Sequence, residues 1–300
     1  MLKRYLRWGI VAAAIAFLAH TLVGHWGEIT AIRLRSGGTG MLSLALVTTL
    51  LAHAWSGWVW SWILQALQQP VSGTWSTPVY LKTNLLKYLP GNVWHFYGRV
   101  RALGEIGVAR GPAIIGVVLE PLLMAAAALL LGLASPTPYW PGQIAVLGLV
   151  LAAVHPRWLN PVMIRLGQAK VKNQNLEPLA PNPLHRYPFK SLAGELGFVL
   201  LRGLGFALVV NAISPLPQTM WLLVVSQFSL AWLGGLVIPG APGGLGVFEA
   251  IAVTLLHDAL SMGVILSAVA LYRLVSTLAE AAGAGCAVLG QWLATSSPTT

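Results

Sequence analysis

The uncharged stretches of this chain limit its fold more than any other feature. No charged residue occurs between Arg202 and Glu249, and none follows Glu280 in the 300-residue sequence. Only 9% of the residues are charged and 56% are hydrophobic, whereas about a quarter of the residues in a soluble domain are charged. Because water cannot solvate such a surface, we expect an integral membrane protein without a soluble catalytic domain.

Seven apolar stretches are long enough to cross a membrane, which takes about 20 helical residues for a hydrocarbon core of roughly 30 Å. All are expected to be helices, because backbone polar groups in lipid must be paired within the segment. The expected fold class is all-α, a polytopic membrane helix bundle that forms a single transmembrane domain over residues 1–300. The stretches cover 8–26, 40–67, 112–134, 142–158, 191–213, 218–238 and 261–290.

Two further stretches are apolar but interrupted by proline and glycine, which a continuous helix does not tolerate. The first covers 78–103 and breaks at Pro90-Gly91. The second covers 235–257 and holds Pro and Gly repeatedly between Pro239 and Gly246. We expect each to be a broken or re-entrant segment that is buried in protein or lines a cavity.

The two broken segments also suggest an internal repeat. Paired Pro/Gly-interrupted segments in two halves of a transporter commonly mark its binding site. The halves would be 40–134 and 191–290, joined by a cytoplasmic loop over 159–190. The order of the predicted crossings makes these halves parallel rather than inverted.

Basic residues set the expected orientation. The chain has 18 Lys and Arg against 8 Asp and Glu, a formal net charge of +10. Eleven of these basic residues lie in the stretches 68–111 and 157–190, which the positive-inside rule places in the cytoplasm together with the N-terminus. The expected location is therefore the cytoplasmic (inner) membrane of the cell. Because the charge gathers between apolar stretches, membrane lipids rather than nucleic acid are the expected partners.

Charged residues within predicted spans include Glu120, Arg273 and Glu280. Each costs several kcal/mol in a membrane unless it is paired or hydrated. One interpretation is a structural ion pair that joins Glu120 to Arg273. The other is a polar path for a lipid headgroup or a coupling ion. Glu195 and Arg202 repeat the seven-residue spacing of Arg273 and Glu280.

The broken segments supply candidate ligands for a phosphate group. Arg99, flanked by Lys87, would sit at the mouth of a cavity and bind phosphate through its planar guanidinium. The alternative is that both residues are positive-inside anchors. A helix that begins near Val247 would direct its amide groups at Gly243 to Gly246. Glu249 in its first turn would suit the same N-terminus.

The remaining polar residues favour neither a metal centre nor an enzyme. His95 lies among aromatic residues and is interpreted as a packed side chain, and the other histidines lack metal-ligand spacing. Cys286 is the single cysteine, so no internal disulfide forms. GxSxG, HExxH and Walker patterns do not occur. We therefore expect no catalytic activity, no metal and no cofactor.

Three motifs carry a resemblance to a known family. The runs KYLPGNVWHFYGR, VVLEPLL and VIPGAPGGLGVFEA resemble the transmembrane domain of bacterial lysylphosphatidylglycerol synthases, which also occurs alone in flippase-like membrane proteins. The resemblance covers roughly residues 5–290 and implies lipid translocation. It implies no synthase activity, because the aminoacyl-transferase domain is missing. The family's motif positions would be Pro90, Gly91, Trp94, Arg99, Glu120, Gly243, Gly244, Gly246 and Glu249.

The function that the sequence favours is a flippase-like transporter that binds and translocates an anionic or phosphate-bearing lipid: a phospholipid, a glycolipid or a polyprenyl phosphate. The alternatives are a membrane-embedded enzyme acting on a lipid phosphate, and an accessory membrane subunit without transport activity. A second copy of the chain or a lipid-modifying enzyme is the expected protein partner. The candidate substrate-binding residues are Lys87, Pro90, Gly91, Asn92, Trp94, His95, Arg99, Glu120, Gly240, Gly243, Gly244, Gly246, Glu249, Arg273 and Glu280.

Overall fold

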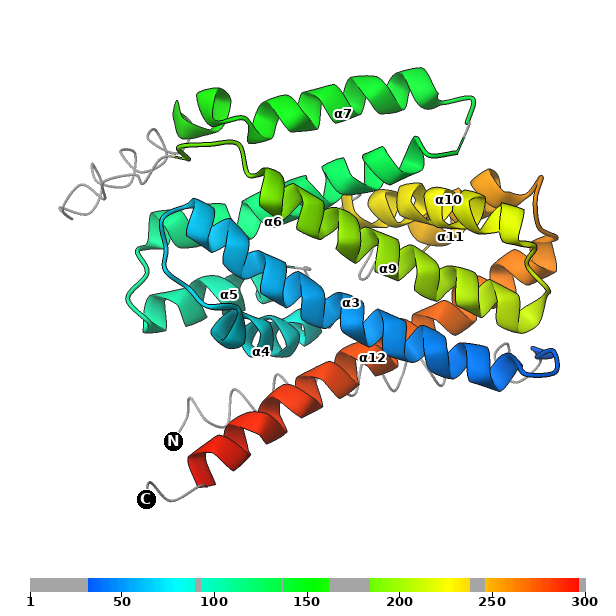
Figure 1. The fold of residues 1–300 in the computed structure, drawn as a ribbon, viewed down its shortest axis with the longest axis horizontal. Coiled ribbons are helices and arrows are strands. Elements are labelled where there is room, and N and C mark those ends of the chain that lie inside the picture. Colours follow the sequence, from blue (N-terminus) through cyan, green and yellow to red (C-terminus); the bar gives the residue numbers. More distant parts are fainter. Residues whose placement is uncertain (1–31, 90–92, 136, 162–183, 238–245, 297–300) are drawn as a thin grey trace.

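The chain forms a bundle of helices (Figure 1). The computed structural model describes residues 32–89, 93–135, 137–161, 184–237 and 246–296, and no strand occurs among them. The predicted all-α membrane bundle is thereby confirmed. Its elements are α3 (Gly38–Ala66), α4 (Gly73–Asn84), η1 (Leu85–Tyr88), α5 (Trp94–Glu105), α6 (Arg110–Gly132), α7 (Trp140–Val154), α9 (Phe189–Ile213), α10 (Gln218–Val237), α11 (Val247–Leu256) and α12 (Met262–Ser296).

Five helices, α3, α6, α9, α10 and α12, are long and apolar enough to cross a membrane. They coincide with five of the seven predicted spans. The span predicted over 142–158 corresponds to α7, which has 15 residues and a length of about 22 Å, short of a hydrocarbon core of about 30 Å. The span predicted over 8–26 lies outside the described residues.

The centre of the bundle is the pair α3 and α9, which pack along each other and also contact α4, α6, α10 and α12. Glycines allow the close approach of these helices, as is common in membranes. A Cβ added at Gly57 of α3 would lie 2.9 Å from the Cα of Thr77 in α4. One added at Gly194 of α9 would meet the side chain of Val59 in α3 at 2.6 Å. Larger side chains at these crossings would push the helices apart.

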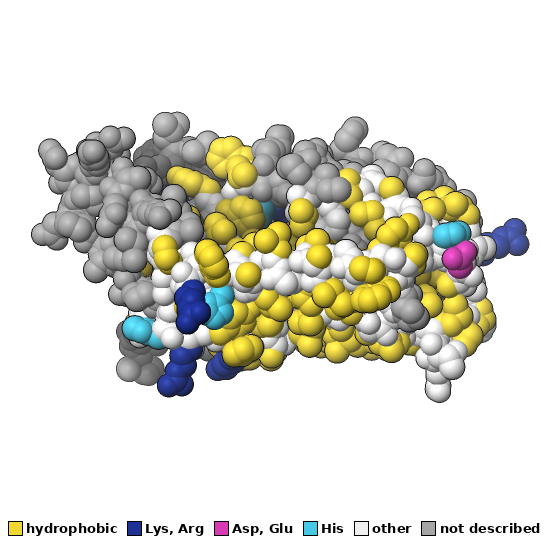
Figure 2. Space-filling view, turned by 90° about the horizontal axis from the view of Figure 1, so that it is seen from above, with side chains coloured by type: hydrophobic (Ala, Val, Ile, Leu, Met, Phe, Trp, Pro, Cys, Tyr) yellow, Lys and Arg dark blue, Asp and Glu magenta, His cyan; other side chains and the backbone are white. Residues whose placement is uncertain are grey.

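The connections gather at two ends of the bundle (Figure 1). α3 ends, α6 begins, α7 ends and α9 begins at one end, which we call the basic end because Arg101, Arg110 and Arg157 lie there. At the opposite end α6 ends and α10 begins. On the face seen in Figure 2, the described surface between the two ends is mainly apolar, and Lys and Arg side chains lie at both ends, most of them at the basic end. Arg101 and Arg157, from the two stretches predicted to share one side of the membrane, both lie in the described part of the chain.

The two broken segments enter the bundle from opposite ends (Figure 1), whereas the order of the predicted crossings made the two halves parallel. α4, η1 and α5 leave the basic end and return to it before α6 begins (Figure 1). α10 starts at the opposite end, and α11 packs on α10 and returns there before α12 begins. The sequence predicted a span over 218–238, which α10 matches, and a broken or re-entrant segment over 235–257, which contains α11. Opposed hairpins are the geometry of an inverted rather than a parallel arrangement.

Cysteine labelling tests this arrangement. In a Cys286→Ser background, Arg101→Cys and Arg157→Cys should react with a membrane-impermeant maleimide from one side of the membrane. Gln218→Cys should react from the other side, because its exposed side chain lies at the opposite end. Labelling of positions 101 and 218 from the same side would contradict the fold.

Candidate functional site

Helix α12 carries two charged residues that bind the two broken segments. The Glu280 carboxylate, which is 1% exposed, accepts a hydrogen bond of 2.6 Å from Nζ of Lys87 at the end of η1. Arg273, seven residues earlier, forms an ion pair of 2.5 Å with Glu249 in the first turn of α11. The first broken segment is therefore attached to α12 through Glu280, and the second through Arg273.

These two attachments bring the broken segments close together along α12. Seven residues correspond to about two helical turns, a rise of about 10 Å, so the two side chains leave nearly the same face. The predicted meeting of Pro90-Gly91 with Gly240 to Gly246 involves residues 90–92 and 238–245, which lie outside the described residues. The described flanks, η1 and α11, do converge on one face of α12.

A polar cluster surrounds Lys87 and joins three spanning helices. Arg202 of α9 donates a hydrogen bond of 2.7 Å from Nη1 to Oγ of Ser276, and the same nitrogen lies 2.9 Å from Nε2 of His53. Nε2 of His53 also lies 3.2 Å from Oε1 of Glu280. We call Lys87, His53, Arg202, Ser276 and Glu280 the Lys87 cluster. All of its members are buried except Lys87, whose side chain is 23% exposed.

The Lys87 cluster carries more positive than negative charge. His53 is neutral when Nε2 accepts the hydrogen bond from Arg202, which leaves Lys87 and Arg202 against the single carboxylate of Glu280. Burial lowers the pKa of Lys87, and the neighbouring Glu280 opposes that shift by favouring the charged amine. Nε of Arg202 is buried and has no hydrogen-bond partner among the described residues. The cluster thus has a surplus positive charge and an unused donor, both of which an anion could satisfy.

Arg99 and Glu120 form a second buried ion pair, between α5 and α6. Nη1 of Arg99 donates to Oε2 of Glu120 at 2.5 Å, and both side chains are almost fully buried. The guanidinium also lies 3.8 Å from the centre of the Tyr80 ring. Arg99 therefore lies in the interior rather than at the mouth of a cavity. The predicted pairing of Glu120 with Arg273 is wrong, because α5 packs on α6 and brings Arg99 to Glu120, whereas Arg273 binds Glu249.

Glu195 of α9 is 0% exposed, and α9 packs on α6, the helix that carries Glu120. Neither of its carboxyl oxygens has a hydrogen-bond partner among the described residues. Of the charged groups that the structure describes, Glu120 and Arg99 are those that act on it electrostatically. The seven-residue spacing of Glu195 and Arg202 is visible in the sequence. Neither of these residues, nor His53, was predicted as a substrate-binding residue. A carboxylate within an otherwise apolar helix was the signal that could have singled out Glu195.

Among the other predicted site residues, some pack in the interior, some cap a helix, and some lie outside the described residues. His95 is buried, its ring centre lies 3.8 Å from that of Phe96, and burial lowers its pKa to about 3, so it packs as a neutral ring. Trp94 is exposed. Gly246 has a positive φ of 84°, and its N–H donates to Oε2 of Glu249 at 2.8 Å. The predicted anion site at the start of α11 thus already holds the carboxylate of Glu249. The positions outside the described residues are Pro90, Gly91, Asn92, Gly240, Gly243 and Gly244.

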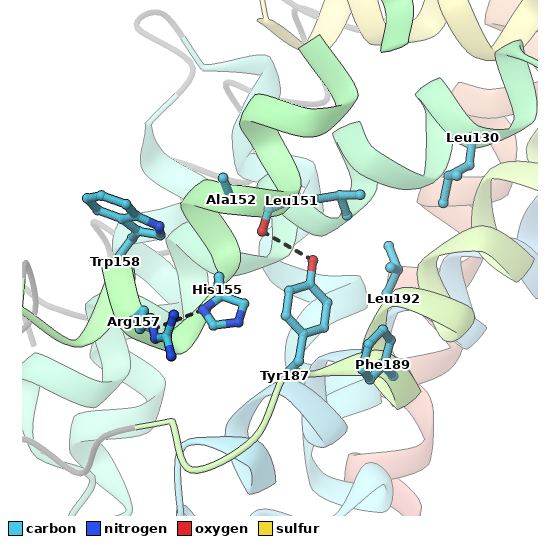
Figure 3. Close-up of a pocket in the computed structure, with 9 residues that line it drawn as sticks. All are labelled: Leu130, Leu151, Ala152, His155, Arg157, Trp158, Tyr187, Phe189 and Leu192. Atoms are coloured by element: carbon cyan, nitrogen blue, oxygen red, sulfur yellow. Dashed lines mark hydrogen bonds between the residues drawn. The ribbon is translucent and has the colours of Figure 1, made fainter. Parts of the chain in front are cut away.

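An apolar pocket of about 520 Å³ lies away from these charges, at the basic end (Figure 3). It opens between α7, the turn that follows it and the beginning of α9. His155, Arg157 and Trp158 line one side of it, and Tyr187 donates a long hydrogen bond of 3.5 Å to the carbonyl of Leu151. The rest of its lining is Leu130, Leu151, Ala152, Phe189 and Leu192. Its chemistry, apolar with a cation at the rim, suits a lipid chain.

Comparison with known proteins assigns no family. No family model matches the chain, and no curated protein matches it significantly. Among the described residues, no group of three or more His, Cys, Asp or Glu is placed to hold a metal ion. What the site does must therefore be inferred from its own geometry.

Double-mutant cycles test the observed charge pairing. Glu249→Gln and Arg273→Gln should each destabilise the protein in detergent by about 2 kcal/mol, between the values for exposed and fully buried pairs. The double variant should lose clearly less stability than the sum of the losses in the two single variants. In the matched cycle, Glu120→Gln and Arg273→Gln should be additive, since these residues do not meet. Coupling in the second cycle and additivity in the first would restore the pairing that the sequence suggested.

Proposed function

We propose that this protein is a flippase-like membrane transporter that binds the headgroup of an anionic or phosphate-bearing lipid at the Lys87 cluster. The observation that carries the proposal is the surplus positive charge of that cluster inside an apolar bundle. An unbalanced buried charge costs several kcal/mol. A phosphate would offset this cost by bonding to Lys87 and to the unused Nε–H of Arg202.

The surroundings of the cluster favour a lipid over a soluble anion. The spanning helices expose large apolar side chains, among them Leu51, Val118 and Leu222, so a lipid's acyl chains can stay in the bilayer while its headgroup enters the protein. The pocket at the basic end offers an apolar surface with Arg157 at its rim, which suits a lipid approaching from that side. If the basic end faces the cytoplasm, as the positive-inside rule predicts, lipid would enter from the inner leaflet of the cytoplasmic membrane.

The opposed hairpins support a path through the protein. Each hairpin forms one ion pair with α12, Lys87–Glu280 from the basic end and Glu249–Arg273 from the opposite end. The first hairpin is also joined to α12 by hydrogen bonds from Lys82 to Gln291 and between Tyr88 and Thr277. An incoming phosphate competes with Glu280 for Lys87 and would loosen the first hairpin. Loosening of the second pair would open the other end. The resemblance of the Pro-Gly motifs to flippase-like proteins agrees with this proposal.

Lipid binding measured by native mass spectrometry tests the headgroup site. Lys87→Gln should weaken the binding of phosphatidylglycerol by about tenfold, the effect of losing one charge-assisted hydrogen bond. Binding of zwitterionic phosphatidylcholine should change little, because its net charge is zero. Arg101→Gln is the matched control, since it removes a basic residue from the exposed surface of the neighbouring helix α5.

If Lys87→Gln and Arg101→Gln bind phosphatidylglycerol as tightly as the parent, the Lys87 cluster is not a headgroup site. Size-exclusion chromatography of each variant separates this result from misfolding, because Glu280 loses a buried partner in Lys87→Gln.

A further inference from the structure

Glu195 is a buried carboxyl group that the proposed headgroup site does not use. It lies in the first third of α9, it is 0% exposed, and no described residue hydrogen-bonds to either of its oxygens. An ionised carboxylate without a partner in an apolar interior costs so much that the group takes up a proton instead. Glu195 is therefore a neutral carboxylic acid in this conformation.

The neighbourhood of Glu195 contains one cation for two carboxyl groups. Glu120 of α6 and Arg99 of α5 are the described charges that act on it, and Tyr80 of α4 faces the same cluster. The adjacent part of α3 contributes apolar and aromatic side chains, with Val59 and Trp55 close to Gly194 and Gly197. No described charge on α10 or α12 acts on Glu195. Arg99 can neutralise one carboxylate, and in the structure it neutralises Glu120.

We propose that Glu195 and Glu120 form a proton-binding site with Arg99, in which Arg99 neutralises one carboxylate and a single proton neutralises the other. A shift of α5 relative to α9 that transfers Arg99 from Glu120 to Glu195 would ionise Glu195. Glu195 would then release its proton to solvent and Glu120 would bind one from solvent, so the total charge of the site stays constant. One proton is thus released and one bound in step with a change of conformation.

The same helices connect this site to the Lys87 cluster. α9 carries both Glu195 and Arg202, which are seven residues and about 10 Å apart along its axis. The first broken segment carries both Lys87 and Arg99. A headgroup that displaces Lys87 or Arg202 would therefore move the elements that hold the proton site. Coupling of lipid movement to protons rests on the proposed function, whereas the proton site itself does not.

Infrared spectroscopy tests the proton site without any lipid. In maltoside detergent, which has no carbonyl group, the wild type at neutral pH should show the C=O stretch of a protonated carboxylic acid, shifted in D₂O. Glu195→Gln should abolish the band. Glu120→Gln should abolish it as well, because Arg99 would then ionise Glu195. Glu105→Gln, at an exposed carboxylate of α5, should keep it.

Two infrared results would overturn the site. Absence of the band in the wild type would mean that Glu195 is ionised. Persistence of the band in Glu120→Gln, with its loss in Glu195→Gln, would mean that Arg99 does not exchange between the two carboxyls.

Lipid movement in vesicles tests the coupling. For each variant, the rate at which fluorescent phosphatidylglycerol crosses the membrane is measured with and without a pH gradient. The quantity compared is the ratio of these two rates. The ratio should differ severalfold from one in the wild type and in Glu105→Gln, and should fall to about one in Glu195→Gln and Glu120→Gln. Lipid movement in the wild type with a ratio of one would overturn the coupling. If the wild type moves no lipid at all, both the proposed function and the coupling are overturned. The infrared result would still show whether the proton site exists.

Discussion

Charge pairing inside an apolar bundle is the constraint on which this structure depends. A charged side chain cannot face hydrocarbon without a cost of several kcal/mol, so each buried charge determines which helices can be neighbours. Glu280 and Arg273 hold η1 and α11 on one face of α12, and Arg99 holds α5 against Glu120 of α6. The short, broken segments also bury apolar side chains, among them Tyr80 and Leu103 of the first and Phe248 of the second. Their ion pairs to α12 are the contacts that a competing anion can weaken.

This dependence links structure to the proposed activity. Continuous spanning helices such as α3 and α9 are fixed by long apolar contacts and close glycine crossings. The hairpins that enter from opposite ends each form an ion pair with α12, and this pair is the contact that an anion can exchange. A phosphate headgroup that replaces Glu280 as the partner of Lys87 exchanges one charge-assisted bond for another. The lipid would in this way open the path that it follows.

The sequence predicted the elements well and their partners poorly. Hydrophobic length alone located α3, α6, α9, α10 and α12, because a bilayer requires a similar run of apolar residues from each spanning helix. It could not show that Glu120 meets Arg99 rather than Arg273, since depth along a helix says nothing about which helices are adjacent. The ten residues of α11 are too few to stand out as a crossing, and the sequence predicted only that 235–257 is broken or re-entrant. Lys87, Arg99, Glu120, Arg273, Glu280 and Glu249 were predicted as polar site residues. His53, Arg202 and Glu195 emerged only when folding brought α3, α9 and α12 together.

A lipid-bound structure tests the central claim most directly. The measurement is a cryo-electron microscopy map of the protein in nanodiscs that contain phosphatidylglycerol. The account predicts headgroup density within hydrogen-bond distance of Lys87 Nζ and Arg202 Nε, with Lys87 displaced from Glu280. A map in which Lys87 remains on Glu280, with lipid density confined to the outer apolar belt, would contradict it.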